Sequence, residues 1–218
     1  MINKLEVDSI QFEINGKKIL SNIYLKCETG SVVGLLGKNG QGKSCLMKII
    51  YGQIHAEKSI RYNNISKTKM FSTPNLLSFV PQFNFLPKRL SVNRVFEDFS
   101  QSFSDFQNYF PELKLDIKAS LKSLSGGERR LIEIYLLLKS NTQFLMLDEP
   151  FTYLSPIQVE KVKHLINSEK INKGIIITDH MYNHILEISD YTYVLFNGQT
   201  RLITNLNELE TYGYLNIH

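Results

Sequence analysis

The chain has 218 residues, of which 43% are hydrophobic, and its formal net charge is +4. This length and composition fit one large folded domain and exclude intrinsic disorder, and the mild charge, without basic runs interleaved with aromatic residues, predicts no nucleic-acid partner. The first eight residues lack the apolar core of a signal peptide, and no window reaches the roughly eighteen apolar residues of a membrane helix, so we expect a cytosolic chain.

The first third of the chain has the pattern of short strands joined by tight turns. Alternating residue types over 5–12, the Asn15-Gly16 turn and the extended pattern that resumes at 19–25 predict an antiparallel β region. A short apolar run and a glycine-rich loop follow, and the periodic segment after that loop predicts a helix. In chain order we expect strands at 5–12, 19–25 and 32–36, a helix at 43–52, and strands at 59–62 and 77–80.

The second half of the chain alternates apolar strands with amphipathic helices. The short apolar runs at 144–147 and 175–178 are typical of strands buried in a parallel sheet that helices cover on both faces. Residues 83–123 are rich in Phe, Ser, Asn and Asp, and their short helical patterns predict a small helical subdomain. The Asn197-Gly198 turn predicts a hairpin. In chain order we expect short helical pieces at 92–103, helices at 127–138 and 157–167, hairpin strands at 191–196 and 199–203, and a helix at 206–211.

The loop Gly37-Lys38-Asn39-Gly40-Gln41-Gly42-Lys43-Ser44 stands between a strand and a helix, which is the arrangement of a phosphate-binding loop. Its glycines permit positive-φ turns that aim backbone N–H groups at a phosphate chain, and the helix adds its positive dipole end. In such loops the lysine reaches the β- and γ-phosphates and the next hydroxyl ligates Mg²⁺. The alternative is a chance glycine-rich turn. We expect a nucleoside triphosphate to be bound by Gly37, Asn39, Gly40, Gly42, Lys43 and Ser44.

Together these patterns predict an α/β fold. Its core is that of a P-loop NTPase, with a mostly parallel sheet flanked by helices, and an antiparallel β region and a small helical subdomain are added to that core.

An acidic pair, Asp148-Glu149, ends the apolar run at 144–147. It therefore lies at the carboxyl end of a sheet strand, where open α/β sheets bind their ligands. The first carboxylate can hold Mg²⁺ through its water shell, and the second can orient, or take a proton from, a water that attacks the γ-phosphate. The alternative is a solvated acidic turn before Pro150.

A serine and two glycines, Ser125, Gly126 and Gly127, stand immediately before the long amphipathic helix. Such a segment makes a second anion site, without a lysine, at a helix N-terminus. The alternative is a helix cap, in which Ser125 and Glu128 form a capping box.

The order and spacing of these segments, together with Gln82 and His180, resemble the nucleotide-binding subunits of ATP-binding cassette (ABC) transporters over nearly the whole chain. The resemblance implies one ABC ATPase domain at 1–218, with the core and β region at about 1–82 and 124–218 and the helical subdomain at 83–123. It implies ATP and Mg²⁺ as cofactors, ATP hydrolysis, and a head-to-tail dimer of two nucleotide-binding subunits, identical or not, around two ATP molecules. In that dimer, Ser125 to Gly127 of one copy complete the γ-phosphate pocket of the other.

By the same resemblance, Gln82 reaches Mg²⁺ and the attacking water, and His180 is the switch histidine that contacts the γ-phosphate. Without the resemblance, they would be an ordinary loop residue and a core or capping histidine. The apolar residues of 83–90 lie where the family accepts a transmembrane permease subunit, or they belong to the core of the subdomain. The implied catalytic residues are Glu149, His180 and Gln82, and the implied metal ligands are Ser44, Gln82 and Asp148. The implied location is the inner face of the cell membrane.

Three positions depart from the family pattern. Ser155 stands where an aspartate normally helps to link the two nucleotide sites, and Ile14 stands where an aromatic residue is expected to stack on adenine. Glu128 replaces the commoner glutamine and, with Arg129, Arg130 and the Thr178-Asp179-His180 segment, is similar to lipopolysaccharide-export and branched-chain amino-acid-uptake ATPases.

The leading hypothesis is a transporter motor. Two alternatives stay open: a non-transport ATP switch of the same superfamily, and a degenerate nucleotide-sensing subunit, which Ser155 and Ile14 would suit. The first would be a DNA-maintenance protein with a long heptad insertion or a ribosome-acting protein with two cassettes, and this sequence has neither feature.

Overall fold

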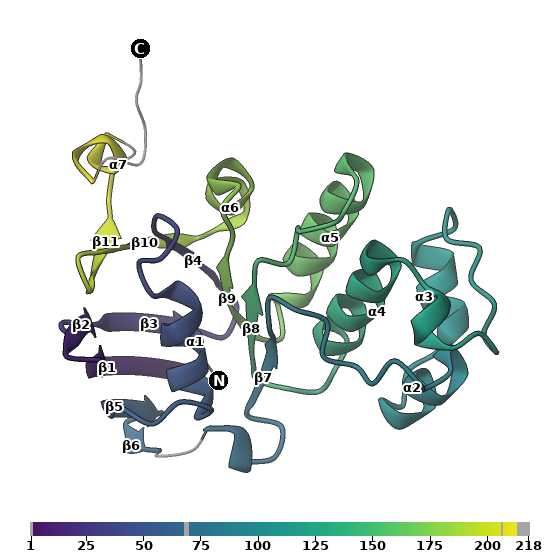
Figure 1. The fold of residues 1–218 in the computed structure, drawn as a ribbon, viewed down its shortest axis with the longest axis horizontal. Coiled ribbons are helices and arrows are strands. Elements are labelled where there is room, and N and C mark those ends of the chain that lie inside the picture. The colour runs from purple at the N-terminus through teal and green to yellow at the C-terminus, as the bar shows by residue number, and fades with distance from the viewer. Residues whose placement is uncertain (1, 68–69, 206, 213–218) are drawn as a thin grey trace.

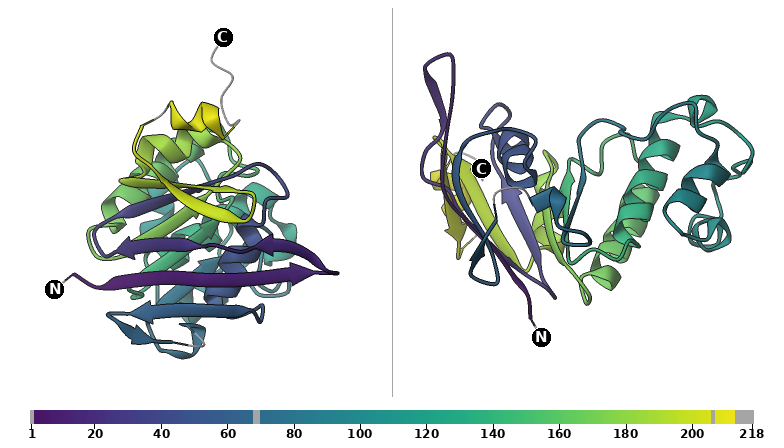
Figure 2. Two further views of the ribbon diagram at one scale, coloured as in Figure 1. Left: turned by 90° about the vertical axis from the view of Figure 1, so that its left-hand side faces the viewer. Right: turned by 90° about the horizontal axis from the view of Figure 1, so that it is seen from below.

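Two β-sheets pack against one buried helix in this computed structural model, which describes residues 2–67, 70–205 and 207–212 (Figure 1). The first sheet is antiparallel and has the order β2-β1-β5-β6, with β3 also paired to β1; it faces the viewer in the left panel of Figure 2. Its strands are β1 (Lys4–Ile14), β2 (Lys17–Leu20), β3 (Tyr24–Glu28), β5 (Glu57–Tyr62) and β6 (Ile65–Ser66).

The second sheet is mostly parallel and has the order β11-β10-β4-β9-β8-β7. Only the hairpin between β10 and β11 is antiparallel, and the other neighbours run in the same direction. Its strands are β4 (Val32–Leu36), β7 (Leu77–Val80), β8 (Phe144–Asp148), β9 (Gly174–Thr178), β10 (Tyr191–Phe196) and β11 (Gln199–Ile203).

The register of the parallel strands aligns the four chain segments that precede the predicted site residues. Val80 pairs with Leu147, Leu147 with Ile177, and Ile177 with Gly34, so the four strands lie at one level. Because each strand ends within two residues of that level, their carboxyl ends meet at the same edge of the sheet.

Helix α1 (Lys43–Tyr51) fills the space between the two sheets (Figure 1). Its buried apolar residues, Leu46, Met47, Ile49 and Ile50, recur at three and four positions and pack in one core with residues of both sheets. The helix is therefore held on both sides, which fixes the loop at its N-terminus.

The remaining helices contribute to a second core on the other face of the parallel sheet. Helices α2 and α3 lie at the end of the molecule far from the antiparallel sheet (Figure 1). The helices are α2 (Val92–Asp98), α3 (Phe103–Tyr109), α4 (Gly126–Leu138), α5 (Pro156–Glu169), α6 (Tyr182–Ile188) and α7 (Glu208–Thr211), with single 3₁₀ turns at Met70–Ser72 and Leu121–Ser123.

An aromatic cluster joins α2 and α3 to α4. The ring centroid of Phe106 lies 5.3 Å from that of Phe96, 5.2 Å from that of Phe110 and 5.1 Å from that of Tyr135 on α4. Tilted and edge-on aromatic pairs at these distances stabilise packing beyond the area they bury. The Phe-rich composition of 83–123 is thus explained by this core, while the division of the chain into core and subdomain stays a prediction.

The expected α/β fold class is confirmed, including the parallel sheet, the antiparallel region and the Asn197-Gly198 hairpin, whose two turn residues have φ of 48° and 75°. Helix α3 lies almost entirely beyond the helical pieces expected at 92–103, and two further elements were not predicted. Helix α6 has only Ile185 and Ile188 buried and forms against β4, where Gly34 leaves room for it. The two-residue strand β6 is too short to leave a pattern. Residue 206, the first of the expected last helix, lies outside the described residues.

We predict that Phe106→Ala lowers the free energy of unfolding by about 3–5 kcal/mol, because the ring is fully buried among four aromatic neighbours. The control is Phe83→Ala, whose side chain is 72% exposed and which should change stability by less than about 0.5 kcal/mol. Denaturant unfolding of both variants measures the difference, and equal effects would contradict a buried aromatic core.

Candidate functional site

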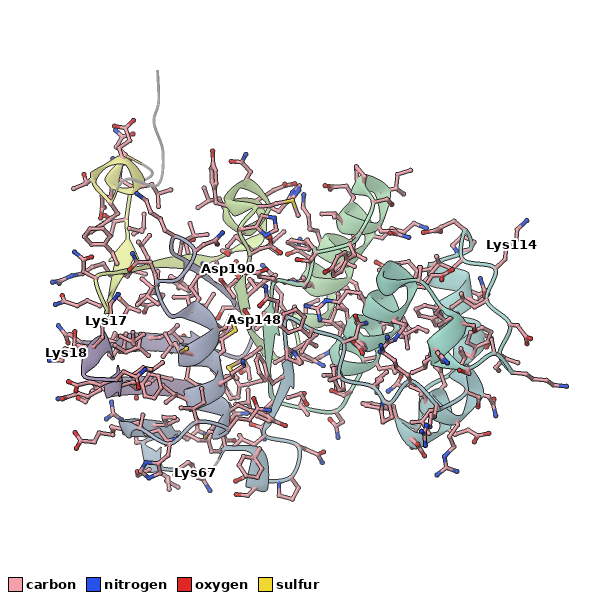
Figure 3. The ribbon with its side chains drawn as sticks, in the orientation of Figure 1. Lys17, Lys18, Lys67, Lys114, Asp148 and Asp190 are labelled. Atoms are coloured by element: carbon pink, nitrogen blue, oxygen red, sulfur yellow. The ribbon has the colours of Figure 1, made fainter. Side chains whose placement is uncertain are left out.

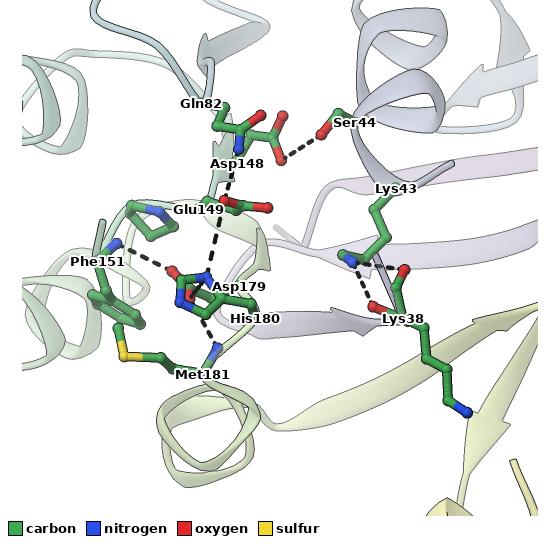
Figure 4. A network of polar contacts seen from close by, with 12 residues as sticks. Lys38, Lys43, Ser44, Gln82, Asp148, Glu149, Phe151, Asp179, His180 and Met181 are labelled. Atoms are coloured by element: carbon green, nitrogen blue, oxygen red, sulfur yellow. Dashed lines mark hydrogen bonds and ion pairs between the residues drawn. The ribbon is translucent and has the colours of Figure 1, made fainter. Parts of the chain in front are cut away.

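The glycine-rich loop runs from the carboxyl end of β4 to the first turn of α1. Gly40 and Gly42 have φ of 80° and 100°, which are accessible to glycine at little cost. The Lys43 ammonium donates hydrogen bonds to the backbone oxygens of Gly37 and, at 3.3 Å, of Lys38 (Figure 4). Burial lowers the pKa of Lys43, and the nearby carboxylates of Glu149, Asp148 and Asp179 oppose that effect. The loop therefore presents a positive charge beside backbone N–H groups.

A cavity of about 440 Å³ opens over this loop. Its walls combine the loop with the ends of β7, β8 and β9 and with the β1–β2 hairpin. The lining residues are Ile14, Ile19, Asn39, Gly40, Gly42, Lys43, Ser44, Cys45, Gln82, Glu149 and His180. Eight of the residues predicted from the sequence thus line one cavity. Gly37 and Asp148 are not among the lining residues, but each is hydrogen-bonded to one of them, Gly37 to Lys43 and Asp148 to Ser44.

The side chains of the other two predicted catalytic residues, Gln82 and His180, point toward Glu149 (Figure 4). Gln82 Nε2 donates a hydrogen bond of 2.8 Å to Glu149 Oε2, and His180 Nδ1 lies 3.9 Å from the same oxygen. Glu149 has φ of 48°, a left-handed conformation that costs a residue other than glycine about 1–3 kcal/mol and that occurs often at functional sites. The surrounding contacts hold the carboxylate at the cavity wall in spite of that cost.

Asp148 lies in the interior of the molecule, whereas Lys17, Lys18 and Lys114 extend from its edges (Figure 3). Ser44 Oγ donates a hydrogen bond of 3.1 Å to Asp148 Oδ1, and Asp148 Oδ2 is buried without a hydrogen-bond partner. Burial raises the pKa of Asp148, and the Ser44 hydroxyl opposes this effect. An unpaired buried carboxylate oxygen beside a hydroxyl fits a hard cation with oxygen ligands, so the residues present suit Mg²⁺.

Asp179 is a residue of this site to which the sequence patterns gave no role. It is fully buried, and its carboxylate accepts hydrogen bonds from the backbone N–H groups of Met181 at 3.0 Å and Phe151 at 3.2 Å, while Oδ1 lies 3.2 Å from His180 Nδ1. It therefore positions His180 and the turn after Glu149. Its place directly after an apolar strand, like that of Asp148, was the available signal.

The Ser125 to Gly127 segment lies outside this cavity, since none of its residues is among those that line it. Within the chain, Ser125 and Glu128 form the capping box of α4, with hydrogen bonds of 2.8 and 3.2 Å. A Cβ added at Gly127 would lie 2.6 Å from the backbone oxygen of Tyr153. The capping alternative is therefore correct for the single chain, and a phosphate role for the segment stays a prediction that requires a second copy.

Ser155, which replaces the family's usual aspartate, caps helix α5. Its hydroxyl accepts a hydrogen bond from the Gln158 N–H, and the Gln158 side chain in turn accepts one from the Ser155 N–H. Serine and aspartate cap helices about equally well. The substitution thus keeps the cap and loses only the negative charge.

The end of the cavity near the β1–β2 hairpin is aliphatic. Ile14 is 46% exposed, and Ile14 and Ile19 line this end without an aromatic side chain among the lining residues that the structure describes. Phe12, two positions earlier, packs against the core between the sheets. Within the part of the chain that the structure describes, this end of the cavity therefore offers no ring to stack on a base.

Arg130 is a second residue that sequence reasoning did not assign to the site. Its guanidinium is buried and donates hydrogen bonds to backbone oxygens next to Gln82 and Glu149. Its signal was a charged residue four positions before Ile134, on the apolar side of the amphipathic helix.

A phosphate loop, a helix N-terminus and polar groups at four parallel strand ends define a P-loop domain that binds nucleoside triphosphates. The family model described as ABC transporter matches residues 20–152, more than half of the chain. The chain belongs to the ABC transporter family and is one of its ATP-binding domains.

Relatives with similar sequences are ATP-binding proteins of transport systems. The chain is 29% identical over 214 residues to the lipopolysaccharide export system ATP-binding protein LptB of Acidithiobacillus ferridurans, covering 91% of this chain and 89% of that protein. It is 26% identical over 218 residues to the xylose/arabinose import ATP-binding protein XylG of Sulfolobus acidocaldarius, covering 91% and 87%. The first relative agrees with the branch that the sequence motifs favoured.

Solved structures share the fold. An ATP-binding subunit of an ABC transporter superposes with a TM-score of 0.78 at 20% identity, covering 96% of this chain and 93% of that one. A bacterial Atm1-family ABC exporter with ATP bound gives 0.82 at 19% identity, covering 95% of this chain but 40% of that one. Among the residues that the structure describes, no helix has the length and apolar character needed to cross a membrane.

We predict that Asp148→Asn stabilises the protein at pH 7. At pH values well below the ordinary pKa of an aspartic acid, the carboxyl is protonated in the folded and the unfolded chain; above its raised pKa it is ionised in both, and the folded chain carries the full cost of burying the charge. The thermal midpoint should therefore rise by about 2–4 °C for each kcal/mol by which the substitution lowers the cost of burying the charge. This rise in the midpoint should become smaller as the pH falls toward 4.

The control for this prediction is Asp98→Asn, a surface change that removes one exposed ion pair with Arg94. The Asp148→Asn protein should also lose the additional thermal stabilisation that Mg²⁺ gives in the presence of ATP. A midpoint that falls at pH 7, or that responds to Mg²⁺ as in the parent, would contradict the assignment of Asp148.

We predict that Ile14→Tyr tightens ATP binding, because a ring at this exposed position can stack on the base where an aliphatic side chain cannot. Stacking contributes about 1–3 kcal/mol per base, so the Kd should fall by about fivefold or more. Calorimetry of both proteins tests this, with Ile171→Tyr, another exposed isoleucine, as the control. An unchanged Kd would show that the base does not lie against Ile14.

Proposed function

We propose that this chain is the ATP-hydrolysing subunit of a membrane transporter, that it forms a dimer around two ATP molecules, and that the ATP cycle moves separate transmembrane permease subunits. One observation carries the proposal: the phosphate loop, Gln82, Glu149 and His180 share one cavity, whereas the Ser125 to Gly127 segment at the N-terminus of α4 lies outside it. One chain thus holds two halves that a second copy can complete.

Within one chain, the proposed chemistry is positioning and electrostatic stabilisation of a phosphoryl group in transfer. Lys43 turns from the loop carbonyl groups toward the β- and γ-phosphates. Glu149 orients the attacking water and accepts its proton, with its carboxylate fixed by Gln82. His180 contacts the γ-phosphate from the end of β9. Ser44, Asp148 and Gln82 would hold Mg²⁺, which supplies positive charge against the phosphate oxygens.

The second copy completes the proposed site. Its Ser125 hydroxyl and the N–H groups at the start of α4 would contact the γ-phosphate, because a helix N-terminus of this length offers unpaired N–H groups and a positive dipole end. The relatives named for lipopolysaccharide export and sugar import are themselves ATP-binding proteins of transport systems, which supports a motor over a switch of another kind.

The proposed docking surface for the transmembrane subunits follows Gln82. Phe83 is 72% exposed and Phe85 is also exposed, and both stand in the segment that leads directly from the catalytic glutamine. The backbone of this segment is fixed to α4, since Glu133 Oε1 accepts hydrogen bonds of 2.8 and 3.0 Å from the N–H groups of Phe85 and Leu86. A partner bound there, at the inner face of the membrane, would therefore sense the state of Gln82.

We predict that Glu149→Gln lowers the kcat for ATP hydrolysis by about 10²- to 10⁴-fold and leaves a dimer that holds ATP, because the amide keeps the contact with Gln82 but cannot accept the proton. Steady-state hydrolysis and size-exclusion chromatography with ATP measure these effects, and Glu97→Gln on the exposed face of α2 is the control. A variant that hydrolyses ATP at the parent rate would contradict the assignment of Glu149 as the catalytic base. A parent that binds ATP without turnover would instead favour a nucleotide sensor.

A further inference from the structure

Arg130 on α4 makes an unusual set of contacts. Its side chain is 1% exposed, and its guanidinium donates hydrogen bonds to four backbone oxygens: those of Pro81 at 2.6 Å, Asp148 at 2.7 Å, Glu149 at 3.0 Å and Pro150 at 3.4 Å. A buried cation needs such partners, because an unpaired charge in the interior is costly. The rigid fork of a guanidinium carries five N–H donors and fits more acceptors at once than the three donors of a lysine ammonium.

The four oxygens belong to the two segments that carry the catalytic side chains. Pro81 directly precedes Gln82 at the end of β7, and Asp148 to Pro150 form the end of β8 and its turn. The side chains of Gln82 and Glu149 are joined by their own hydrogen bond. Glu149 also has a left-handed backbone, which persists only where neighbours hold it. Arg130 is one such neighbour, and the Thr178 oxygen, which accepts from the Glu149 N–H at 2.8 Å, is another.

The N-terminus of the same helix carries the proposed second anion site. Arg130 lies within one helical turn of Gly127, and the first turn of α4 is closed by the Ser125 and Glu128 capping box. The backbone oxygen of Tyr153, in the turn that follows Glu149, lies so close to Gly127 that a Cβ there would meet it at 2.6 Å. The start of α4 and the turn after β8 are thus in contact at two points, through Gly127 and through Arg130.

We propose that Arg130 is a positioning residue that couples the two nucleotide sites of the dimer. This inference rests on the proposed function, in which the start of α4 contacts the ATP bound to the second copy. A displacement of the helix on that contact is transmitted through the guanidinium to the backbone of Gln82 and Glu149 in its own chain. Hydrolysis at one site then depends on whether the other site is occupied.

The test compares Arg130→Met with the parent in three measurements: the kcat for ATP, the Hill coefficient for ATP, and the Kd for ADP, which one chain binds through its phosphate loop. We expect kcat to fall by about tenfold to a hundredfold, since small misplacements of catalytic groups have effects of this size. The Hill coefficient should fall from above one to one. The Kd for ADP should stay within about twofold, because Arg130 is not among the residues that line the cavity.

The matched control is Arg129→Met on the same helix turn; among the described residues, its guanidinium donates to one acceptor, the Leu86 oxygen at 3.3 Å. It should keep the parent Hill coefficient. Arg130→Lys should restore part of kcat and of the Hill coefficient, because an ammonium can reach some of the four oxygens. If Arg130→Met fails to fold, Arg130→Lys decides: a reduced Hill coefficient with parent ADP affinity supports the proposal, and parent behaviour overturns it.

Three other results would overturn the coupling role. The first is a folded Arg130→Met protein with the parent kcat and Hill coefficient. The second is a lower kcat with an unchanged Hill coefficient, which would show that Arg130 positions the catalytic residues of its own chain without coupling the two sites. The third is an equal loss of cooperativity in Arg129→Met. Failure of the proposed function itself would be seen separately, as a parent protein that does not hydrolyse ATP.

Discussion

The in-register pairing of the parallel strands is the constraint on which the site depends. Val80, Leu147, Ile177 and Gly34 lie side by side, so the next residues of each chain segment emerge at one edge. A slip of one residue in any pair would turn a side chain such as Glu149 to the opposite face. The register is fixed because these strands are apolar and buried. Hydrophobic packing thus sets the positions of the polar site residues, although they do not belong to the hydrophobic core.

The sequence was sufficient for the fold class because its strongest signals are local. Apolar strand runs, the Asn197-Gly198 turn and the periodicity of α4 are each set by residues close together in the chain. Helix α6 was missed because its formation depends on packing against Gly34, which lies far away in the sequence. The same limit applied to the aromatic cluster, whose Phe residues were visible but whose common partner on α4 was not.

The residues of the candidate site also fall into two groups, those that local motifs predicted and those whose roles only the structure shows. Lys43, Ser44, Asp148 and Glu149 stand in motifs, and their spacing was enough to expect them at one ligand. Asp179 and Arg130 stand in recognisable segments, but they act through backbone groups of other segments, so only the three-dimensional contacts reveal their roles. The capping boxes at Ser125 and Ser155 show the converse case, in which a residue expected at an interface also has a complete local role. The two roles are compatible, because a cap leaves the other N–H groups of the first turn unpaired.

The close approach of Gly127 to Tyr153 has a consequence for how this sequence can evolve. The neighbour that a new Cβ would meet is a backbone oxygen, which every amino acid at position 153 would present. No substitution at position 153 could therefore compensate for a larger residue at 127, as a smaller side chain could if the contact were between side chains. The constraint therefore falls on one position alone: the residue at 153 can change while the glycine at 127 stays, but the reverse exchange meets the same backbone oxygen whatever stands at 153.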